Sequence, residues 1–186
     1  MTILATTSIP SVTTEERAER LGAAASAWGD RIAANPASAR FTATVHGSAQ
    51  GSVATAVRVG KHHFVIDEPS ALAGDDAAAS PVEYALGALA GCQVVVYRLY
   101  AQALGIQIEG IDVTAEGDLD ARRLFGIEES VRAGFSEVRL TVTISGPEPA
   151  ERYEDLRQAV DAHCPVLDIF ENATPVTTVV RTTPVP

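Results

Sequence analysis

The 186-residue sequence is poor in cysteine, in aromatic residues and in basic charge, and each shortage excludes a class of protein. Its two cysteines, Cys92 and Cys164, are too few for a disulfide scaffold, and neither lies in a C-x-x-C pair of a structural zinc site. Aromatic residues make up 5% of the chain, which argues against a surface that stacks nucleic-acid bases. Lys and Arg number 14 against 24 Asp and Glu, so the net charge of −10 disfavours binding to nucleic acids or anionic membranes.

Sequence motifs for phosphate, metal and serine chemistry are also missing. The chain contains no G-x-x-x-x-G-K-[ST], G-x-G-x-x-G or G-x-S-x-G pattern. His62 and His63 are neighbours in a predicted strand, so their side chains point to opposite faces and do not chelate one ion. His46 and His163 stand alone in the sequence. We therefore expect no metal and no cofactor.

Long apolar runs and targeting signals are absent as well. The longest apolar stretch, residues 84–97, is shorter than the roughly 18 residues that a membrane span needs. The first residues lack a basic segment followed by an apolar core, which a signal peptide would have. We expect a soluble, cytoplasmic protein whose cysteines are kept reduced.

What the chain does contain is the composition of a globular protein, with 46% hydrophobic and 20% charged residues. At about 150 residues per domain, this length predicts one domain with an extension. Residues 1–36 are predicted to be a helical extension, with an amphipathic helix over 13–34 capped by Thr14. This helix either docks on the body or on a partner subunit, or it serves as a functional arm.

The remaining chain, residues 37–183, mixes strand and helix patterns and predicts an α+β fold. Three short strands over 41–67, joined by tight turns, predict an antiparallel meander whose first turn lies at 46–52. Helices are predicted over 81–104 and 147–163, with a short one following Pro165, and further strands over 106–113, 138–144 and 176–181.

The helix over 81–104 is the most informative element. Ser80, Pro81 and Glu83 form a capping box with proline at the first helical position. From Ala85 to Val96 the helix is apolar nearly all round, so we expect it to be buried on most faces.

The two cysteines are the only candidates for reactive groups. A cysteine such as Cys92, inside an apolar helix, is most often a small core residue. Small residues around it leave room for a second element, however, and Cys164 stands at a helix end before a proline. The pair therefore suggests a peroxidatic and a resolving thiol, although spacing alone does not establish that they meet.

The run SPVEYALGALAGC, residues 80–92, strongly resembles the S-P-x-E-x-x-x-x-A-x-x-x-C helix of the OsmC/Ohr superfamily, the osmotically inducible and organic-hydroperoxide-resistance proteins. The resemblance covers about residues 40–182, in order. Its other parts are Asp67-Glu68-Pro69, Ala103-Leu104-Gly105-Ile106, the run VRAGF at 131–135, Cys164-Pro165-Val166 and Asn172.

This resemblance implies an OsmC-like domain over 37–183, in which antiparallel sheets wrap around long central helices in an intertwined homodimer. It also implies a thiol peroxidase of oxidative stress defence. In that activity Cys92 attacks an organic hydroperoxide and becomes a sulfenic acid, and Cys164 condenses with it to a disulfide. A dithiol, lipoyl groups in the Ohr branch, then reduces the disulfide.

The sequence departs from the peroxidase pattern at the charged groups of the site. Family peroxidases carry an arginine near the first turn that pairs with the thiolate, whereas residues 46–52 contain none. Arg58 is our candidate for this role, with Arg40 as a second. The glutamate that holds the arginine corresponds to Glu83, which lies one residue later than in the Ohr branch and is also explained by the capping box. The alternative function is a non-catalytic dimer that binds an apolar ligand between its central helices or senses redox state; a purely structural dimer with inert cysteines is a third reading.

Overall fold

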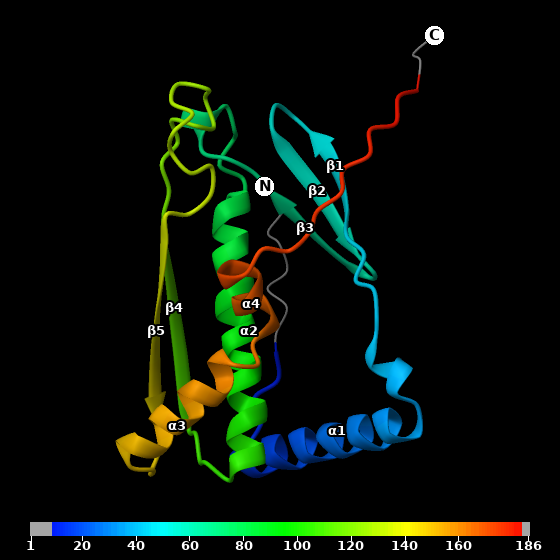
Figure 1. The fold of residues 1–186 in the computed structure, drawn as a ribbon, viewed down its shortest axis with the longest axis vertical. Coiled ribbons are helices and arrows are strands. Elements are labelled where there is room, and N and C mark those ends of the chain that lie inside the picture. Colours follow the sequence, from blue (N-terminus) through cyan, green and yellow to red (C-terminus); the bar gives the residue numbers. More distant parts are fainter. Residues whose placement is uncertain (1–8, 184–186) are drawn as a thin grey trace.

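The computed structural model describes residues 9–183 and has the α+β architecture that the sequence predicts. Two antiparallel sheets, β1-β2-β3 and β4-β5, lie on opposite sides of the long helix α2 (Figure 1). The elements are α1 (Thr14–Ala34), β1 (His46–Gln50), β2 (Ala54–Val59), β3 (His62–Ile66), α2 (Pro81–Leu104), β4 (Gly110–Asp118), β5 (Glu137–Ser145), α3 (Ala150–Asp161) and α4 (Pro165–Glu171), with short 3-10 turns at Pro36–Ala39 and Ser70–Leu72.

Helix α2 begins and ends where its capping residues predict. The hydroxyl of Ser80 accepts from the backbone N–H of Glu83, and the Glu83 carboxylate accepts from the backbone N–H of Ser80. Gly105 ends the helix in the left-handed conformation, with a φ of 63° that favours glycine. None of the helices in residues 9–183 is long and apolar enough to cross a membrane.

The expectation that α2 is buried on most faces is wrong for the single chain. One face is buried and carries Leu89, Gln93, Val96, Tyr97 and Ala101. The opposite face is exposed along its length and carries Gly87, Gly91, Val95 and Leu99. The core of the same chain therefore buries only one of the two apolar faces of this helix.

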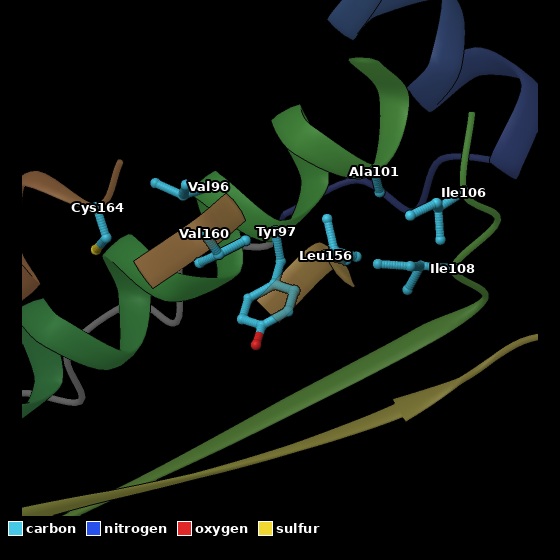
Figure 2. Close-up of a cluster of buried hydrophobic side chains, with 8 residues drawn as sticks. All are labelled: Val96, Tyr97, Ala101, Ile106, Ile108, Leu156, Val160 and Cys164. Atoms are coloured by element: carbon cyan, nitrogen blue, oxygen red, sulfur yellow. The ribbon is translucent and has the colours of Figure 1, made fainter. Parts of the chain in front are cut away.

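The hydrophobic core lies on the buried face of α2, between this helix, α3 and the segment 105–109 that leads into β4 (Figure 2). It consists of Val96, Tyr97, Ala101, Ile106, Ile108, Leu156, Val160 and Cys164. β4 and β5 pair antiparallel, and alternate residues of both strands turn a half-buried face toward the helices. The core thus places α3, and the turn that follows it, against the middle of α2.

Two predicted strands are corrected by the structure. The first strand was expected from residue 41, but β1 starts at His46, so most of the predicted first turn is strand and the turn itself is 51–53. Residues 172–183 form no strand, although a last strand was expected over 176–181. Phe41 and Val176 are 83% and 84% exposed, and neither segment pairs with a strand of the described chain. A period-two pattern marks a strand face, but a strand also needs a hydrogen-bonding partner.

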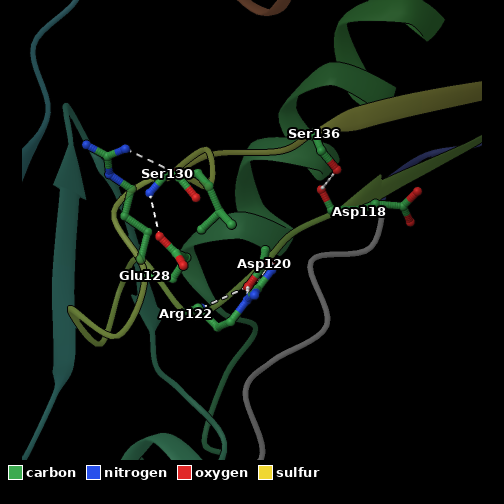
Figure 3. A network of polar contacts seen from close by, with 8 residues as sticks. Asp118, Asp120, Arg122, Glu128, Ser130 and Ser136 are labelled. Carbon is green, nitrogen blue, oxygen red and sulfur yellow. Dashed lines mark hydrogen bonds and ion pairs between the residues drawn. The ribbon is translucent and has the colours of Figure 1, made fainter.

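The connection between β4 and β5 is held by local polar contacts (Figure 3). Arg122 pairs with Asp120, the Glu128 carboxylate accepts from the backbone N–H of Ser130, and Ser136 donates to the carbonyl of Asp118. These contacts bring Phe135 onto Gly117 of β4, where an added Cβ would lie 2.6 Å from the ring. Phe135 also stacks on Phe170 of α4, with ring centroids 6.3 Å apart. The connection therefore bridges the sheet and α4.

Helix α1 crosses the C-terminal end of α2 (Figure 1). Its N-cap is Thr13, one residue before the predicted Thr14, because Thr13 and Glu16 form a reciprocal capping box. Of the predicted apolar face, Leu21 is half-buried, while Trp28 remains 45% exposed. The helix docks on the body through part of its length only.

Candidate active site

The fold brings together the two cysteines, which are 72 residues apart in the sequence. The thiol of Cys164 donates to the sulfur of Cys92, with the two Sγ atoms 3.3 Å apart. Both are free thiols. Cys92 lies in the middle of α2, and Cys164 is the residue before α4, with its side chain directed toward α2 (Figure 2). Because core packing holds α3 and α4 against α2, this distance is a property of the tertiary structure.

The two sulfurs differ in access. Cys164 is 2% exposed, whereas Cys92 is half-buried and is therefore the more open of the two. Burial raises the pKa of the Cys92 thiol above its ordinary value, a backbone hydrogen bond from Val166 lowers it, and the neighbouring Cys164 raises it again. The pKa of Cys92 in the single chain is therefore raised, and the group is a neutral thiol near pH 7.

The arginines proposed as thiolate partners are not at the site in the single chain. Arg58 lies on β2, exposed, opposite His46 on β1 and His63 on β3. Neither Arg58 nor Arg40 is among the groups that shift the pKa of Cys92. The observed turn at 51–53 contains no arginine either. Within residues 9–183, no guanidinium hydrogen-bonds either sulfur.

Glu83 is at the start of α2, where it caps the helix. Its Oε2 accepts hydrogen bonds of 2.7 Å from both the backbone N–H and the hydroxyl of Ser80. These bonds lower the pKa of Glu83 below its ordinary value. Nine residues at a rise of about 1.5 Å place Glu83 roughly 13 Å along the helix axis from Cys92. The structure therefore shows its capping role and does not bring it to the thiols.

Two buried polar residues of α2 were missed by sequence reasoning. Gln93 and Tyr97 are each 1% exposed and lie one turn apart on the buried face of the helix. Burial, followed by the charge of Asp161, raises the pKa of Tyr97 to about 12. The available signal was a lone amide within an otherwise apolar run. No three His, Cys, Asp or Glu side chains of the described range, 9–183, come together as a metal site.

Comparisons with known proteins agree with the fold and the motif. The family model described as "OsmC: OsmC-like protein" matches residues 74–179, more than half of the chain, and includes both cysteines. Among curated proteins, none matches this sequence.

Several solved structures share the fold at low identity. An OsmC-like protein from Mycoplasma pneumoniae aligns with a TM-score of 0.63 at 16% identity, over 70% of this chain and 88% of its own. An organic hydroperoxide resistance protein OsmC from Legionella pneumophila aligns with a TM-score of 0.55 at 22% identity, over 70% and 89%. An organic hydroperoxide resistance protein from Elizabethkingia anophelis aligns with a TM-score of 0.55 at 23% identity, over 70% and 88%. The sequence motif, the fold and the family model agree, and the chain belongs to the family of OsmC-like proteins.

Proposed function

We propose that the protein is a thiol peroxidase that reduces organic hydroperoxides, with Cys92 as the attacking thiol and Cys164 as the resolving thiol. The observation that carries the proposal is the 3.3 Å separation of the two sulfurs. A disulfide bond is about 2.05 Å long, so closing it requires the sulfurs to approach by about 1.3 Å. Local movement of the turn before α4 is sufficient for such a shift.

The first step uses the more accessible sulfur. The thiolate of Cys92 attacks the O–O bond of ROOH, the sulfur takes one oxygen as a sulfenic acid, and the alkoxide leaves and is protonated to ROH. Cys164 supports this assignment because its sulfur already lies 3.3 Å from that of Cys92, so it is placed to follow the attack.

In the second step the two cysteines form a disulfide, and in the third step this disulfide is reduced. The thiol of Cys164 attacks the sulfenic sulfur of Cys92, which forms the disulfide and releases one water molecule. A dithiol then reduces the disulfide by thiol–disulfide exchange and is itself converted to a disulfide. We propose a small or protein-bound dithiol such as a lipoyl group, and we place the protein in the cytoplasm, where such reductants keep the pair reduced.

We propose that the working form is a homodimer that joins two chains through the exposed face of α2. At Gly87 and Gly91 an added Cβ would meet no atom within 4 Å, so nothing in the described chain covers these positions. Val95, on the same face, is 57% exposed. Small residues on a helix allow a second helix to approach closely, and the apolar residues between them gain from burial.

The homodimer also supports a role for Arg58. Attack requires a thiolate, and burial in a single chain works against it by raising the pKa of Cys92. Arg58 is exposed on β2 and forms no ion pair within residues 9–183. We propose that assembly of the dimer brings an Arg58 guanidinium to each Cys92 and lowers its pKa.

The test is a stoichiometric reaction of the reduced protein with cumene hydroperoxide, followed by intact mass and free-thiol counts. We expect the wild-type protein to lose both thiols and two mass units. We expect Cys164→Ser to gain one oxygen, trapped at Cys92 by dimedone. Cys92→Ser should consume no peroxide above the buffer rate.

Thiols that remain unchanged in excess peroxide would overturn the peroxidase proposal and favour the ligand-binding alternative. A disulfide that forms equally fast in Cys92→Ser mixed with Cys164→Ser would show that the pair forms between chains. Circular dichroism of both variants is the control, since serine replaces sulfur without adding bulk.

A further inference from the structure

Helix α1 lies outside residues 74–179, which the family model matches, and the peroxidase chemistry gives it no role. Its two halves have different surroundings. In the first half, which packs against α2, Arg17, Leu21 and Gly22 are half-buried. In the second half every residue from 23 to 34 is exposed. Half of this helix therefore projects from the fold of its own chain.

The exposed half carries two large apolar side chains. Trp28 and Ile32 follow Leu21 by 7 and 11 positions, so they lie on the same face of α1 as this half-buried leucine. Trp28 is 45% exposed, although the Arg31 guanidinium lies 4.8 Å from the centre of its ring and covers one face of it. This face of α1 points to the side of the body, but residues 9–183 of the same chain do not cover it.

The exposed half is also a poor helix by itself. It is about 12 residues long, and helical segments of this length are marginal in water unless tertiary packing covers an apolar face. Gly29 lies in its interior, and glycine lowers helix propensity there. A helix with this composition needs a surface against which Trp28 and Ile32 can pack.

The first half of α1 crosses α2 at the end of the exposed apolar face of that helix. A Cβ added at Gly22 would lie 3.8 Å from Nε2 of Gln102. Gln102 is exposed and follows Leu99 by three positions, which makes the two neighbours on one face of α2. From this crossing, α1 extends on the side of α2 opposite β4, β5 and α3 (Figure 1). The exposed parts of α1 and α2 thus border one another.

The spacing along α2 fits a second helix beside α1. Val95, in the exposed face, and Gln102, at the crossing, are separated by seven positions, about 10 Å along the helix axis. Packed helices lie 8–10 Å apart. A helix of a second chain that crosses the exposed face of α2 near Val95 is therefore close enough to contact the exposed half of α1.

We propose that residues 23–34 of α1 pack against a second copy of this chain and fasten the homodimer, with Trp28 and Ile32 as the contacting side chains. One bound chain then covers the exposed faces of α1 and α2 together. By two-fold symmetry each dimer contains this contact twice. The inference rests on the homodimer proposed above and does not depend on the peroxidase chemistry.

The experiment uses the fluorescence of Trp28, the only tryptophan of the sequence. Light scattering and acrylamide quenching are measured on the full-length protein over one dilution series. As the dimer forms, we expect the emission to move to shorter wavelength and the quenching constant to fall at least about twofold, because the ring leaves water. Gly91→Gln, which adds bulk to the exposed face of α2, should keep the values of an exposed tryptophan wherever its mass is that of a monomer.

The variant Trp28→Ala measures the contribution of the contact to assembly. We expect the dissociation constant of the dimer to rise about a hundredfold, since two buried tryptophans are lost. The circular dichroism of the diluted monomer should not change, because Trp28 is exposed there. Asp30→Ala, on the opposite face of α1, is the matched control and should change the dissociation constant by less than about twofold.

The proposal is overturned if the protein is monomeric at every concentration, or if the dimer leaves Trp28 as accessible to acrylamide as the Gly91→Gln monomer does. A tryptophan shielded in that monomer would show that a ligand or the same chain covers it, and equal dissociation constants for Trp28→Ala and Asp30→Ala would also contradict the contact. Thiol counts after cumene hydroperoxide, taken on the same wild-type samples, separate the two proposals: oxidation without shielding contradicts only this one, and shielding without oxidation contradicts only the peroxidase.

Discussion

The two faces of α2 have similar apolar character but different surroundings. Leu89, on the buried face, is 0% exposed and packs in its own chain, whereas Val95, on the other face, is 57% exposed. Cys92 lies between them, half-buried, at the edge of the core. Hydrophobic periodicity predicts that a helix face is buried, but it does not show whether the same chain or a second chain buries it.

The comparison also shows why the thiols and the amide have different chemistry. The thiol of Cys164 donates to Cys92, whereas Gln93, one residue along the helix, has a buried N–H group with no acceptor among residues 9–183. Neighbouring residues of a helix point about 100° apart, so they belong to different parts of the structure. One side of α2 carries a matched pair of groups, and the other carries a buried donor without a partner within residues 9–183.

The largest expected effect comes from Gly91→Gln on the exposed face. Within its own chain the new side chain meets nothing, so the monomer should keep its circular dichroism spectrum. In a symmetric dimer the bulk is added twice, and we expect association to weaken by about 4 kcal/mol, roughly a thousandfold. Light scattering across a dilution series measures this; an unchanged dimer mass would place the interface elsewhere. Thr141→Gln on the outer face of β5 is the control.

The next effect is on the buried face, where Leu89→Ala should destabilise the fold by about 3 kcal/mol in urea unfolding. The cost comes from lost burial and from the cavity left behind. Val95→Ala is the matched variant, and in the Gly91→Gln background it should cost less than about 0.5 kcal/mol. Equal losses of unfolding free energy for the two variants would show that the two faces of α2 are equally buried in the single chain.

A smaller effect is expected on the pKa of Cys92, measured by thiolate absorbance in the Cys164→Ser background. In the Gly91→Gln monomer the pKa should stay raised, so peroxide reactivity should climb about tenfold per pH unit through neutral pH. Dimerisation should lower the pKa by about one unit or more, about 1.4 kcal/mol, and Arg58→Met should reverse this. A pKa that is the same in monomer, dimer and Arg58→Met would exclude the arginine.

The same raised pKa has a consequence for stability. Because burial favours the neutral thiol, the contribution of Cys92 to monomer stability is present below the pKa of the unfolded chain. It is lost as the pH rises through the higher pKa of the folded state. The stability difference between the Gly91→Gln variant and its Cys92→Ser form, read from urea midpoints, should therefore be constant around pH 6 and shift against the Cys92 form at alkaline pH.

The smallest effect is a gain. Gln93→Leu removes the unsatisfied donor, so the protein should become more stable by about 1 kcal/mol. Gln102→Leu, an exposed position of the same helix, should change stability little. A loss of stability in Gln93→Leu would mean that the amide has a partner in the folded protein.

Local signals in the sequence predicted the elements that depend on near neighbours. The bounds of α2 follow from Ser80, Glu83 and Gly105, because caps act within one turn of the helix. The alternation over 138–144 predicted β5 to within one residue at each end. The domain boundary near residue 37 and the catalytic roles of the cysteines, Glu83 and Arg58 stay predictions.

Structural features that depend on residues distant in the sequence were predicted less well. The segments 41–45 and 176–181 alternate like strands but do not pair with a strand in the described chain. Gln93 is an amide within the apolar run 84–97, and no local pattern shows whether an amide finds an acceptor.

The sequence alone determined the class of fold, the bounds of the central helix and the two thiols as candidates, because capping, periodicity and motif spacing act over a few residues. Only the tertiary structure decided that Cys92 and Cys164 meet at 3.3 Å, that no arginine within residues 9–183 hydrogen-bonds either sulfur, and that the Gln93 amide is buried without a partner in that range. These three results depend on how α3, α4 and the sheets pack against α2. Packing brings together residues that are far apart in the sequence, and their distance in the sequence does not predict their distance in space.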